Sequence, residues 1–294
     1  MKYRTLGQGL EVSAIGIGCM PMIKGGNILY GEAADLDEST RTIHRAIDLG
    51  VTFFDTAQIY GPFTNEELLG EAIRGKRTGL VIATKFGFKF DGKQIVGVDG
   101  SPENARRSCE GSLQRLGIDT IDLFYQHRVD PSVPIEETVG GMMELVKEGK
   151  VRAIGVSNFQ KVDLDNILDS CTIRPAVNQI LAHIGNTPFD LIAHTESKGV
   201  LVEAYSPVGH GEILKNPDLK AMAQRYGVTV PQLSIRYCLQ LGLLPLPKTA
   251  NPDHMRSNAA QDFKIDDADM GRLKSIERIK DYGESSAFPV FRGN

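Results

Sequence analysis

The sequence predicts an α/β protein of the (β/α)8, or TIM, barrel class. Eight short apolar, β-branched runs alternate with amphipathic stretches along 294 residues, and no linker or change of composition divides them. Short loops join these runs, and repeated right-handed β-α units close into a parallel barrel. We therefore expect residues 1–294 to form a single domain with an N-terminal β-hairpin, a C-terminal extra helix and a tail.

Local patterns define each element in chain order. A hairpin-like segment surrounds Gly7–Gly9. The predicted strands are Ala14–Cys19, Thr52–Ala57, Leu80–Lys85, Ile121–His127, Val151–Val156, Ala176–Ile180, Val200–Tyr205 and Leu243–Pro247. The predicted helices are Glu38–Leu49, Asn65–Ile73, Pro102–Leu116, Pro134–Lys147, Lys161–Leu168, Phe189–Ser197, Pro217–Tyr226, Pro231–Leu241, Pro252–Ala260 and Asp266–Ile279. Glycines close six of them, at Gly50, Gly117, Gly149, Gly199, Gly227 and Gly242.

Composition excludes several classes of protein. The chain has 33 Lys and Arg against 37 Asp and Glu, so it has no basic field for nucleic acid. It has no apolar run of about 18 residues, so we expect neither a membrane span nor secretion. Its cysteines and histidines lack metal-site spacing, and we expect reduced thiols, no metal and a cytoplasmic location.

A barrel places its chemistry at the carboxyl ends of its strands. Nearly every predicted strand brings a polar or ionisable group to this rim. The strand ends are Gly18-Cys19-Met20, Asp55, Lys85, His127, Ser157-Asn158, Gln179, Tyr205-Ser206-Pro207 and Lys248-Thr249. We therefore expect the functional site at this rim.

Three of these rim groups, together with Tyr60 in the following loop, can carry out acid–base chemistry. Asp55, Lys85 and His127 end three neighbouring strands, and Tyr60 follows Asp55 by five residues. Asp55 would keep Lys85 charged, and the ammonium would lower the pKa of Tyr60 until the phenol acts as a general acid or base. His127 could orient a substrate oxygen. Such a set can protonate an alkoxide as a carbonyl is reduced.

No side chain supplies a hydride, so this chemistry needs a nicotinamide cofactor at the same rim. Tyr205 offers a flat face for stacking on the ring. Ser157, Asn158 and Gln179 can bind its carboxamide. Lys248 and Thr249 precede a helix near Pro252, where a helix N-terminus and a lysine can bind phosphate.

The chain resembles the aldo-keto reductases over almost its full length. The matching motifs are Asp55-Thr56-Ala57-x-x-Tyr60-Gly61, Ala83-Thr84-Lys85, Asp122-Leu123-x-x-Gln126-His127, Gly155-Val156-Ser157-Asn158-Phe159, Val177-Asn178-Gln179, Ala204-Tyr205-Ser206-Pro207 and Pro247-Lys248-Thr249. The resemblance implies reversible NAD(P)H-dependent reduction of a small aldehyde or ketone by a tetrad of Asp55, Tyr60, Lys85 and His127.

The resemblance also implies a set of cofactor contacts. Ser157, Asn158 and Gln179 would bind the carboxamide, Tyr205 would stack on the ring, and Lys248 and Thr249 would bind the ribose phosphate. Ser206, Pro207 and Val208 would line the pyrophosphate, and His254 and Asn258 would lie near the adenine end. Further expected cofactor contacts are Gly18, Cys19, Met20 and Asp55, with Cys19 near the nicotinamide. NADPH is favoured because Lys248 and Thr249 are present. NADH remains open, since His254 stands where the family often has Arg.

The sequence departs from the family around the substrate pocket. Arg128 follows His127 where many relatives have Trp-Pro, Phe86-Gly87 follows Lys85 where a Trp is common, and the chain has no Trp. The substrate therefore stays undefined. We expect the tail Asp281–Asn294, with Tyr282, Phe288 and Phe291, to fold over the mouth of the pocket. The sequence is compatible with a monomer and does not specify the oligomeric state.

Two alternative functions remain open. Some barrels that resemble this family serve as nicotinamide-binding regulatory subunits of channels, with little turnover. A barrel lyase or aldolase would use Lys85 as a Schiff-base amine, although Asp55 beside it disfavours a neutral amine. Cys19 is interpreted as a small pocket-lining residue in preference to a reactive thiol.

Overall fold

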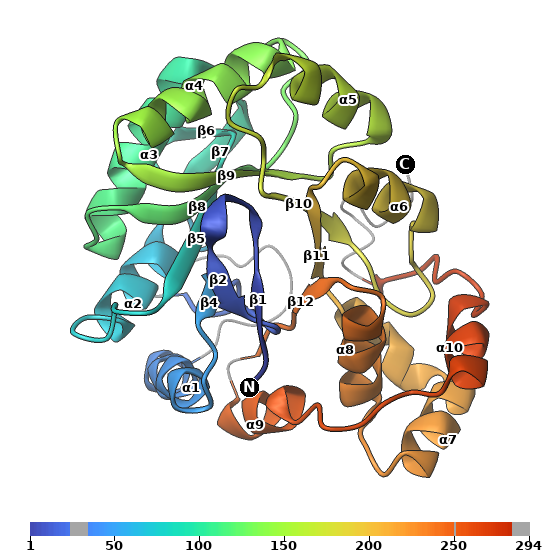
Figure 1. Cartoon of the computed structure of the whole chain (residues 1–294). Coiled ribbons are helices and arrows are strands. Elements are labelled where there is room, and N and C mark those ends of the chain that lie inside the picture. Colours follow the sequence, from blue (N-terminus) through green and yellow to red (C-terminus); the bar gives the residue numbers. More distant parts are fainter. Residues whose placement is uncertain (24–34, 250, 284–294) are drawn as a thin grey trace.

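The computed structural model describes residues 1–23, 35–249 and 251–283, and they form the predicted barrel (Figure 1). Its eight parallel strands are paired in the order β12-β11-β10-β9-β8-β5-β4-β3. The ring closes between β3 and β12, where the amides of Gly16 and Gly18 donate to the carbonyls of Pro245 and Pro247 at 3.1 and 3.2 Å. The strands are β3 (Ile17–Gly18), β4 (Phe53–Asp55), β5 (Val81–Phe86), β8 (Ile121–Gln126), β9 (Val151–Ser157), β10 (Val177–Leu181), β11 (Leu201–Tyr205) and β12 (Leu244–Leu246). All eight predicted strands are confirmed, the first as a much shorter strand.

Helices surround the barrel at the predicted places. They are α1 (Leu36–Asp48), α2 (Thr64–Ala72), α3 (Pro102–Leu116), α4 (Ile135–Lys147), α5 (Lys161–Ser170), α6 (Phe189–Ser197), α7 (Pro217–Arg225), α8 (Val230–Gln240), α9 (Pro252–Ala259) and α10 (Asp267–Lys274). The six glycines predicted to end helices all adopt positive φ, between 62° and 84°. The prediction for α10 was too long: the helix ends at Lys274, and the chain continues in an extended path to Ile279, whose amide donates to the carbonyl of Gly185 at 2.9 Å.

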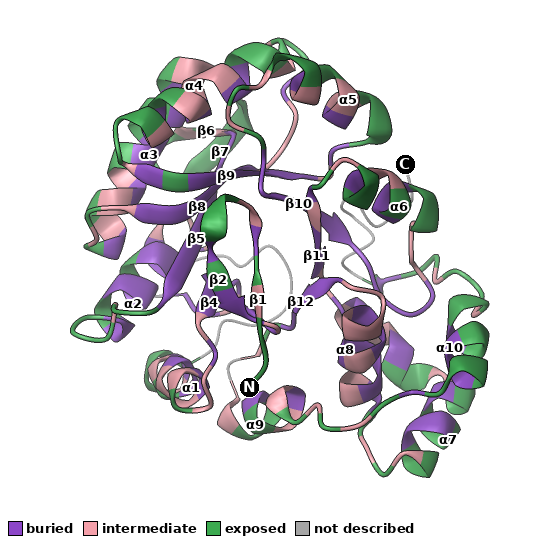
Figure 2. Cartoon of the chain, viewed as in Figure 1, coloured by how far each residue is buried: buried purple, intermediate pink, exposed green. Residues whose placement is uncertain are grey.

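Apolar side chains fill both the barrel and the layer outside it. Figure 2 shows the strands of the eight-stranded barrel buried along most of their length and the outer faces of the helices exposed. The largest cluster lies between the strands and α3 to α8, and a second cluster fills the lower barrel interior around Phe53, Leu123 and Val177. Strands buried on both faces explain why their sequences are continuous apolar runs.

The N-terminal hairpin closes the bottom of the barrel, as predicted. Strands β1 (Tyr3–Thr5) and β2 (Glu11–Ser13) pair antiparallel across a 3-10 turn at Gly7–Gly9. Leu6, Leu10 and Val12 pack into the lower interior cluster. A Cβ on Gly7 would lie 2.8 Å from the Cα of Ala176, so this close approach requires glycine.

Two short elements were not predicted. A second hairpin, β6 (Phe88–Asp91) with β7 (Gln94–Val98), follows β5 at the carboxyl rim. All five residues of β7 are exposed. A strand without a buried face has no alternating pattern to reveal it, which is why it was missed. A 3-10 segment, Gly209–Lys215, lies between β11 and α7.

Within the part of the chain that the structure describes, no helix combines the length and apolar character needed to cross a membrane.

Candidate active site

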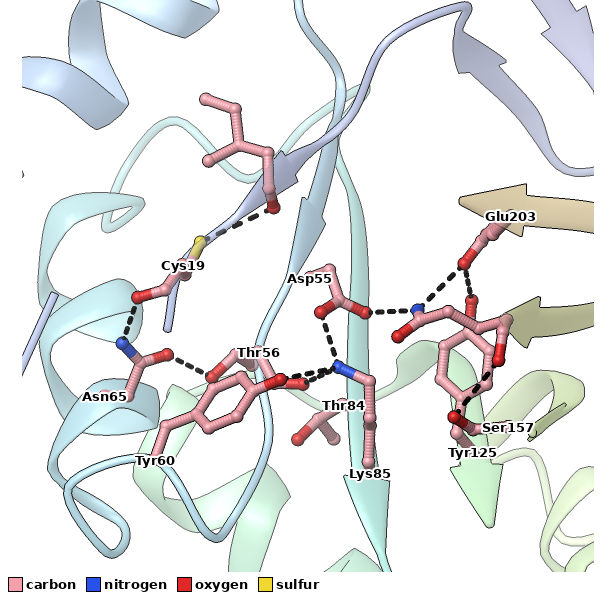
Figure 3. Close-up of polar contacts among 12 residues, drawn as sticks. Cys19, Asp55, Thr56, Tyr60, Asn65, Thr84, Lys85, Tyr125, Ser157 and Glu203 are labelled. Carbon is pink, nitrogen blue, oxygen red and sulfur yellow. Dashed lines mark hydrogen bonds and ion pairs between the residues drawn. The ribbon is translucent and has the colours of Figure 1, made fainter. Parts of the chain in front are cut away.

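A buried ion pair stands at the centre of the carboxyl rim. Lys85, at the end of β5, donates from Nζ to Oδ1 of Asp55 at the end of β4 (Figure 3). The same ammonium donates to the carbonyl of Thr56 at 2.9 Å and lies 3.4 Å from the hydroxyl of Tyr60. Its three donors therefore have three acceptors, and the charge is compensated although Lys85 is only 1% exposed.

Tyr60 is brought to this pair by the loop that follows β4. Its amide donates to the carbonyl of Ala57 at 3.1 Å, which turns the loop back over the barrel. Burial, and then the Asp55 carboxylate, raise the pKa of Tyr60 well above its usual range. The sequence predicts the opposite direction, a lowered pKa, because the ammonium of Lys85 is visible in the sequence and the burial of the phenol is not. Tyr60 is therefore protonated at neutral pH, which is the state of a proton donor.

His127 completes the group at the end of β8. Its amide donates to the carbonyl of Phe86 at 2.7 Å. The imidazole stands edge-on to Tyr60 and to Phe88, with ring centroids 6.2 and 5.3 Å apart. Burial, then the charges of Lys85 and Arg128, lower the pKa of His127 well below its usual range, so the ring is neutral. Its buried Nδ1 has no hydrogen-bond partner among the described residues.

A second polar chain, not anticipated from the sequence, runs from Asp55 across the barrel interior. Gln179 on β10 donates from Nε2 to Oδ2 of Asp55 at 2.9 Å and to Oε2 of Glu203 at 3.0 Å. The hydroxyl of Tyr125 donates to the same oxygen of Glu203. Figure 3 shows this chain meeting the Lys85 contacts at Asp55. Burial raises the pKa of Glu203 to about 8, so this carboxyl is largely protonated at pH 7.

Cys19 lies behind the site and not on its surface. Its side chain is 1% exposed, its thiol lies 3.8 Å from the carbonyl of Ile17, and burial raises its pKa. Its carbonyl and that of Met22 accept hydrogen bonds from Nδ2 of Asn65, at 2.6 and 2.5 Å. Asn65 thus fixes the segment after β3. The expected contact of Cys19 with a cofactor and the reactive-thiol alternative are both disfavoured by this burial.

The four acid–base residues surround a small cavity of about 90 Å³. Asp55, Tyr60 and His127 line it. Lys85 is not among the lining residues and acts on the cavity through its contacts with Asp55 and Tyr60. The other lining residues are Gly18, Met20, Arg128, Ser157, Asn158, Gln179, Tyr205, Ser206, Leu246 and Lys248. Most side chains predicted for the nicotinamide end therefore meet around one space.

The strand ends on one side of this cavity have unusual backbone geometry. Asn158 after β9 and Ser206 after β11 have φ of 59° and 49°, in the left-handed region that few non-glycine residues adopt. Oδ1 of Asn158 accepts from the hydroxyl of Tyr205 at 2.9 Å, and its Nδ2 donates to Oγ of Ser157 at 3.0 Å. These hydrogen bonds hold the side chains of Asn158 and Tyr205 at the rim. Left-handed backbone at non-glycine residues, as at Asn158 and Ser206, is typical of functional sites.

A larger cavity of about 670 Å³ adjoins the first, and Ser206 and Lys248 line both. It contains the residues predicted for the phosphate and adenine end: Pro207, Val208, Thr249, His254 and Asn258. Seven further wall residues were not predicted: His210, Gly211, Glu212, Leu214, Thr229, Pro231 and Ser257. Tyr282 and Gly283, from the predicted tail, complete the lining. The two adjoining spaces share Ser206 and Lys248, and concave, largely apolar sites with a few polar groups are typical of cofactor binding.

The start of α9 differs from the expected phosphate site. Oδ1 of Asn251 accepts from the amides of Asp253 and His254 at 2.8 and 3.1 Å, so these helix N-terminal donors are already used. Side chains at this end, such as Lys248 and Thr249, remain for an anion. Arg256 pairs with Asp253 at 3.3 Å and is not among the residues that line the cavity.

One aromatic residue of the predicted tail, Tyr282, lies within the described residues. Tyr282 lines the larger cavity and not the acid–base cavity, and its hydroxyl lies 2.9 Å from Nε2 of His183. Nδ1 of the same histidine contacts the carbonyl of Ile184 at 2.7 Å. Phe288 and Phe291 lie outside the described residues, so the lid stays a prediction from the sequence.

The likeness to known proteins agrees with this geometry. A model of the Aldo/keto reductase family matches residues 14–278. A probable aldo-keto reductase 1 of Glycine max is 34% identical over 311 residues, which cover 93% of this chain and 88% of that protein. A thermostable aldo-keto reductase in complex with the inhibitor epalrestat has a TM-score of 0.83 at 30% identity, covering 94% of this chain and 99% of that one.

A solved structure of an aldo-keto reductase from Klebsiella pneumoniae in complex with NADPH has a TM-score of 0.79 at 30% identity and covers 93% of this chain and 94% of that one. Together, the barrel and the polar rim define an oxidoreductase of the (β/α)8 class. The chain belongs to the aldo/keto reductase family.

Proposed function

We propose that this protein reduces small aldehydes or ketones to alcohols with NADPH, and that Tyr60 supplies the proton. The observation that carries the proposal is the position of the Tyr60 hydroxyl, 3.4 Å from the buried ammonium of Lys85 and on the wall of a cavity that His127 also lines. A carbonyl oxygen in this cavity can accept hydrogen bonds from both Tyr60 and His127.

The cofactor-binding residues proposed here follow the two connected cavities. Bound NADPH supplies the hydride. Tyr205 would stack on its ring, while Ser157, Asn158 and Gln179 would bind the carboxamide. Both protons of the Gln179 amide are engaged by Asp55 and Glu203, which leaves its side-chain carbonyl as the acceptor. Lys248 and Thr249 support NADPH over NADH, as does the NADPH bound in the Klebsiella relative.

Side chains of the protein itself hold the proton and transfer it to the substrate. Tyr60 holds it, because its pKa is raised, and releases it to the substrate oxygen as negative charge develops there. Lys85 stabilises the resulting phenolate, since its ammonium already faces that oxygen. Neutral His127 donates a hydrogen bond and does not compete as an acid. Asp55 keeps Lys85 in place throughout.

The alternative of a Schiff-base lyase has little support. Lys85 is 1% exposed, its ammonium has three acceptors, and it is not among the residues that line the cavity. A carbonyl substrate could not reach Nζ without displacing Asp55. No observation favours a purely regulatory role. The cytoplasmic location and the oligomeric state remain predictions from the sequence.

Tyr60→Phe tests the proposal. The variant keeps the ring and its contacts but removes the proton, so kcat for carbonyl reduction should fall at least about 100-fold. The dissociation constant for NADPH, measured by fluorescence titration, should change less than 3-fold, because the hydroxyl is assigned to the substrate oxygen. The assay follows NADPH and NADH oxidation in parallel over a panel of aldehydes and ketones.

Tyr226→Phe is the matched control. Tyr226 ends α7, its hydroxyl donates a hydrogen bond to Asp269 at 2.9 Å, and it lines neither cavity. It should retain the wild-type rate. A Tyr60→Phe protein that turns over carbonyls at the wild-type rate would contradict the proposed proton donor.

A further inference from the structure

Arg128 occupies an unusual position in the acid–base cavity. It follows His127 at the carboxyl end of β8 and lines the cavity beside Tyr60. Its backbone is held in place, since its carbonyl accepts from Nε2 of Gln126 at 3.2 Å and a Cβ on Gly87 would touch its amide at 3.5 Å. The side chain is half-buried. The end of β8 therefore places the positively charged side chain of Arg128 at the cavity in which a substrate would bind.

The guanidinium of Arg128 has no ion pair or side-chain hydrogen bond within residues 1–23, 35–249 and 251–283. Arg77 and Arg115 are also half-buried, and they pair with Asp122 and with Glu66, the latter at 2.6 Å. Arg45 on α1 is half-buried without such a partner among the described residues, but it lines neither cavity. A guanidinium on a cavity wall that keeps its donors unused can bind a ligand of opposite charge. The guanidinium of Arg128 thus has hydrogen-bond donors for which the described residues supply no acceptor.

The charges around Arg128 reinforce this requirement. Asp55 is the one carboxylate among the residues lining the cavity, and it is neutralised by Lys85. Lys248 lines the junction with the larger cavity, where the cofactor is proposed to lie. Arg128 is close enough to Tyr60 and His127 to lower the pKa of both. The positive charge of Arg128 therefore acts on Tyr60 and His127, and the one carboxylate that lines the cavity is already paired with Lys85.

From this geometry we infer that the substrate is a small oxo acid, in which a carboxylate pairs with Arg128 while the carbonyl oxygen lies between Tyr60 and His127. The inference rests on the proposed reductase function and adds the substrate class. A guanidinium binds a planar carboxylate through two parallel hydrogen bonds, which fixes orientation as well as adding affinity. Arg128, Tyr60 and His127 line the same cavity, so a carboxylate and a carbonyl that reach them belong to one short molecule. The carboxylate itself is unchanged by the reaction.

A matched pair of substrates tests the inference. Succinic semialdehyde and its methyl ester have the same aldehyde and nearly the same size, and they differ in the negative charge. The wild-type protein should prefer the acid at least about 10-fold in kcat/KM, as expected for a charge-assisted hydrogen bond. In Arg128→Met this ratio of acid to ester should fall at least about 10-fold, and in Arg128→Lys it should fall less.

The ratio isolates the role of the charge. Loss of Arg128 also alters Tyr60 and His127, and that effect is common to both substrates and cancels. Arg41→Met is the matched control, because Arg41 is exposed on α1 and lines neither cavity. It should keep the wild-type ratio. A wild-type ratio near one, or a ratio that survives in Arg128→Met, would overturn the inference.

A binding measurement separates this inference from the proposed reaction. Butanoate and butanamide are titrated by calorimetry into the NADP+-loaded protein, and neither is turned over. Butanoate should bind at least about 10-fold more weakly to Arg128→Met than to wild type, and butanamide equally to both. Equal butanoate binding would overturn the oxo-acid inference even if carbonyls are reduced. Selective butanoate binding without turnover of any carbonyl would overturn the proposed reductase function and keep Arg128 as an anion site.

Discussion

Asp55 is the residue at which the two polar chains of the site meet. One carboxylate oxygen binds Lys85 and the other binds Gln179, so the acid–base group and the proposed carboxamide-binding group share one anchor. Removing one partner of such a buried pair leaves an uncompensated charge and costs about 3–5 kcal/mol. Asp55 therefore links the stability of the upper barrel to the geometry of catalysis.

Glu203 gives a prediction at the same scale. Burial raises its pKa from 4.5 to about 8. The folded state thus holds the proton more tightly than the unfolded state. This contribution to stability is complete below pH 4.5 and is lost as the pH rises through 8. Glu203→Gln cannot ionise and keeps an oxygen for Tyr125 and Gln179. The free energy of unfolding of the variant, relative to wild type, should therefore rise by about 2 kcal/mol or more between pH 5 and pH 9.

Urea denaturation at the two pH values measures this change. Glu137→Gln, an exposed position on α4, serves as the control and should show no comparable change with pH. If the difference between Glu203→Gln and wild type is independent of pH, Glu203 has an ordinary pKa and the assignment fails.

At the scale of elements, the β6–β7 hairpin is the part of the site that sequence patterns did not reveal. Phe88 at the start of β6 packs edge-on against His127, and Phe90 packs against Phe63 with ring centroids 4.7 Å apart. The hairpin therefore supports the imidazole through a second aromatic contact, beside that with Tyr60, and belongs functionally to the rim. It contributes little to the core, because the whole of β7 is exposed.

Phe88→Ala should accordingly lower kcat/KM for a carbonyl substrate about 5- to 10-fold, because His127 loses the ring that fixes its orientation. The dissociation constant for NADPH should stay within 3-fold of wild type, since the hairpin lines neither end of the proposed cofactor space. Steady-state kinetics and fluorescence titration measure the two effects. Val96→Ala on β7 is 51% exposed and should behave as wild type. An equal loss in both Phe88→Ala and Val96→Ala would point to the hairpin fold and not to the aromatic contact.

At the scale of the whole molecule, stability and chemistry occupy opposite ends of the barrel. The lower end is closed by the N-terminal hairpin and contains the apolar cluster around Leu10, Phe53 and Leu123. Asp122, at the amino-terminal end of β8, is also at this end; it accepts from the amide of Ile82 at 2.8 Å and from Arg152 at 2.7 Å. The upper end contains the acid–base residues and both cavities.

Leu10→Ala tests this division of roles. Leu10 is fully buried, so the substitution should lower the free energy of unfolding by about 2–5 kcal/mol through lost contacts and the cavity that remains. Guanidinium denaturation measures this loss, and Val162→Ala, 62% exposed on α5, should change it by less than about 0.5 kcal/mol. At 25 °C kcat/KM should remain within 2-fold of wild type. A large loss of activity in the folded variant would show that packing of the N-terminal hairpin also determines the geometry of the active site.

The sequence by itself determined the order of strands and helices, because buried parallel strands read as apolar runs and helix ends carry caps and glycines. It also placed Asp55, Lys85 and His127 at neighbouring strand ends, since the barrel topology dictates which ends are adjacent. These are local or periodic properties, and they are visible in a single chain.

Only the tertiary structure decided the electrostatics and the supporting contacts. The direction of the Tyr60 pKa depends on burial, which no spacing reveals. The chain from Gln179 to Glu203 joins residues from different strands, and the support of His127 by Phe88 needs a hairpin without a buried face. Arg128 was visible in the sequence as a departure from the family. Its significance appeared only when the fold placed it in a cavity where Asp55, the one carboxylate among the lining residues, already pairs with Lys85, because the partners of a side chain depend on its three-dimensional surroundings.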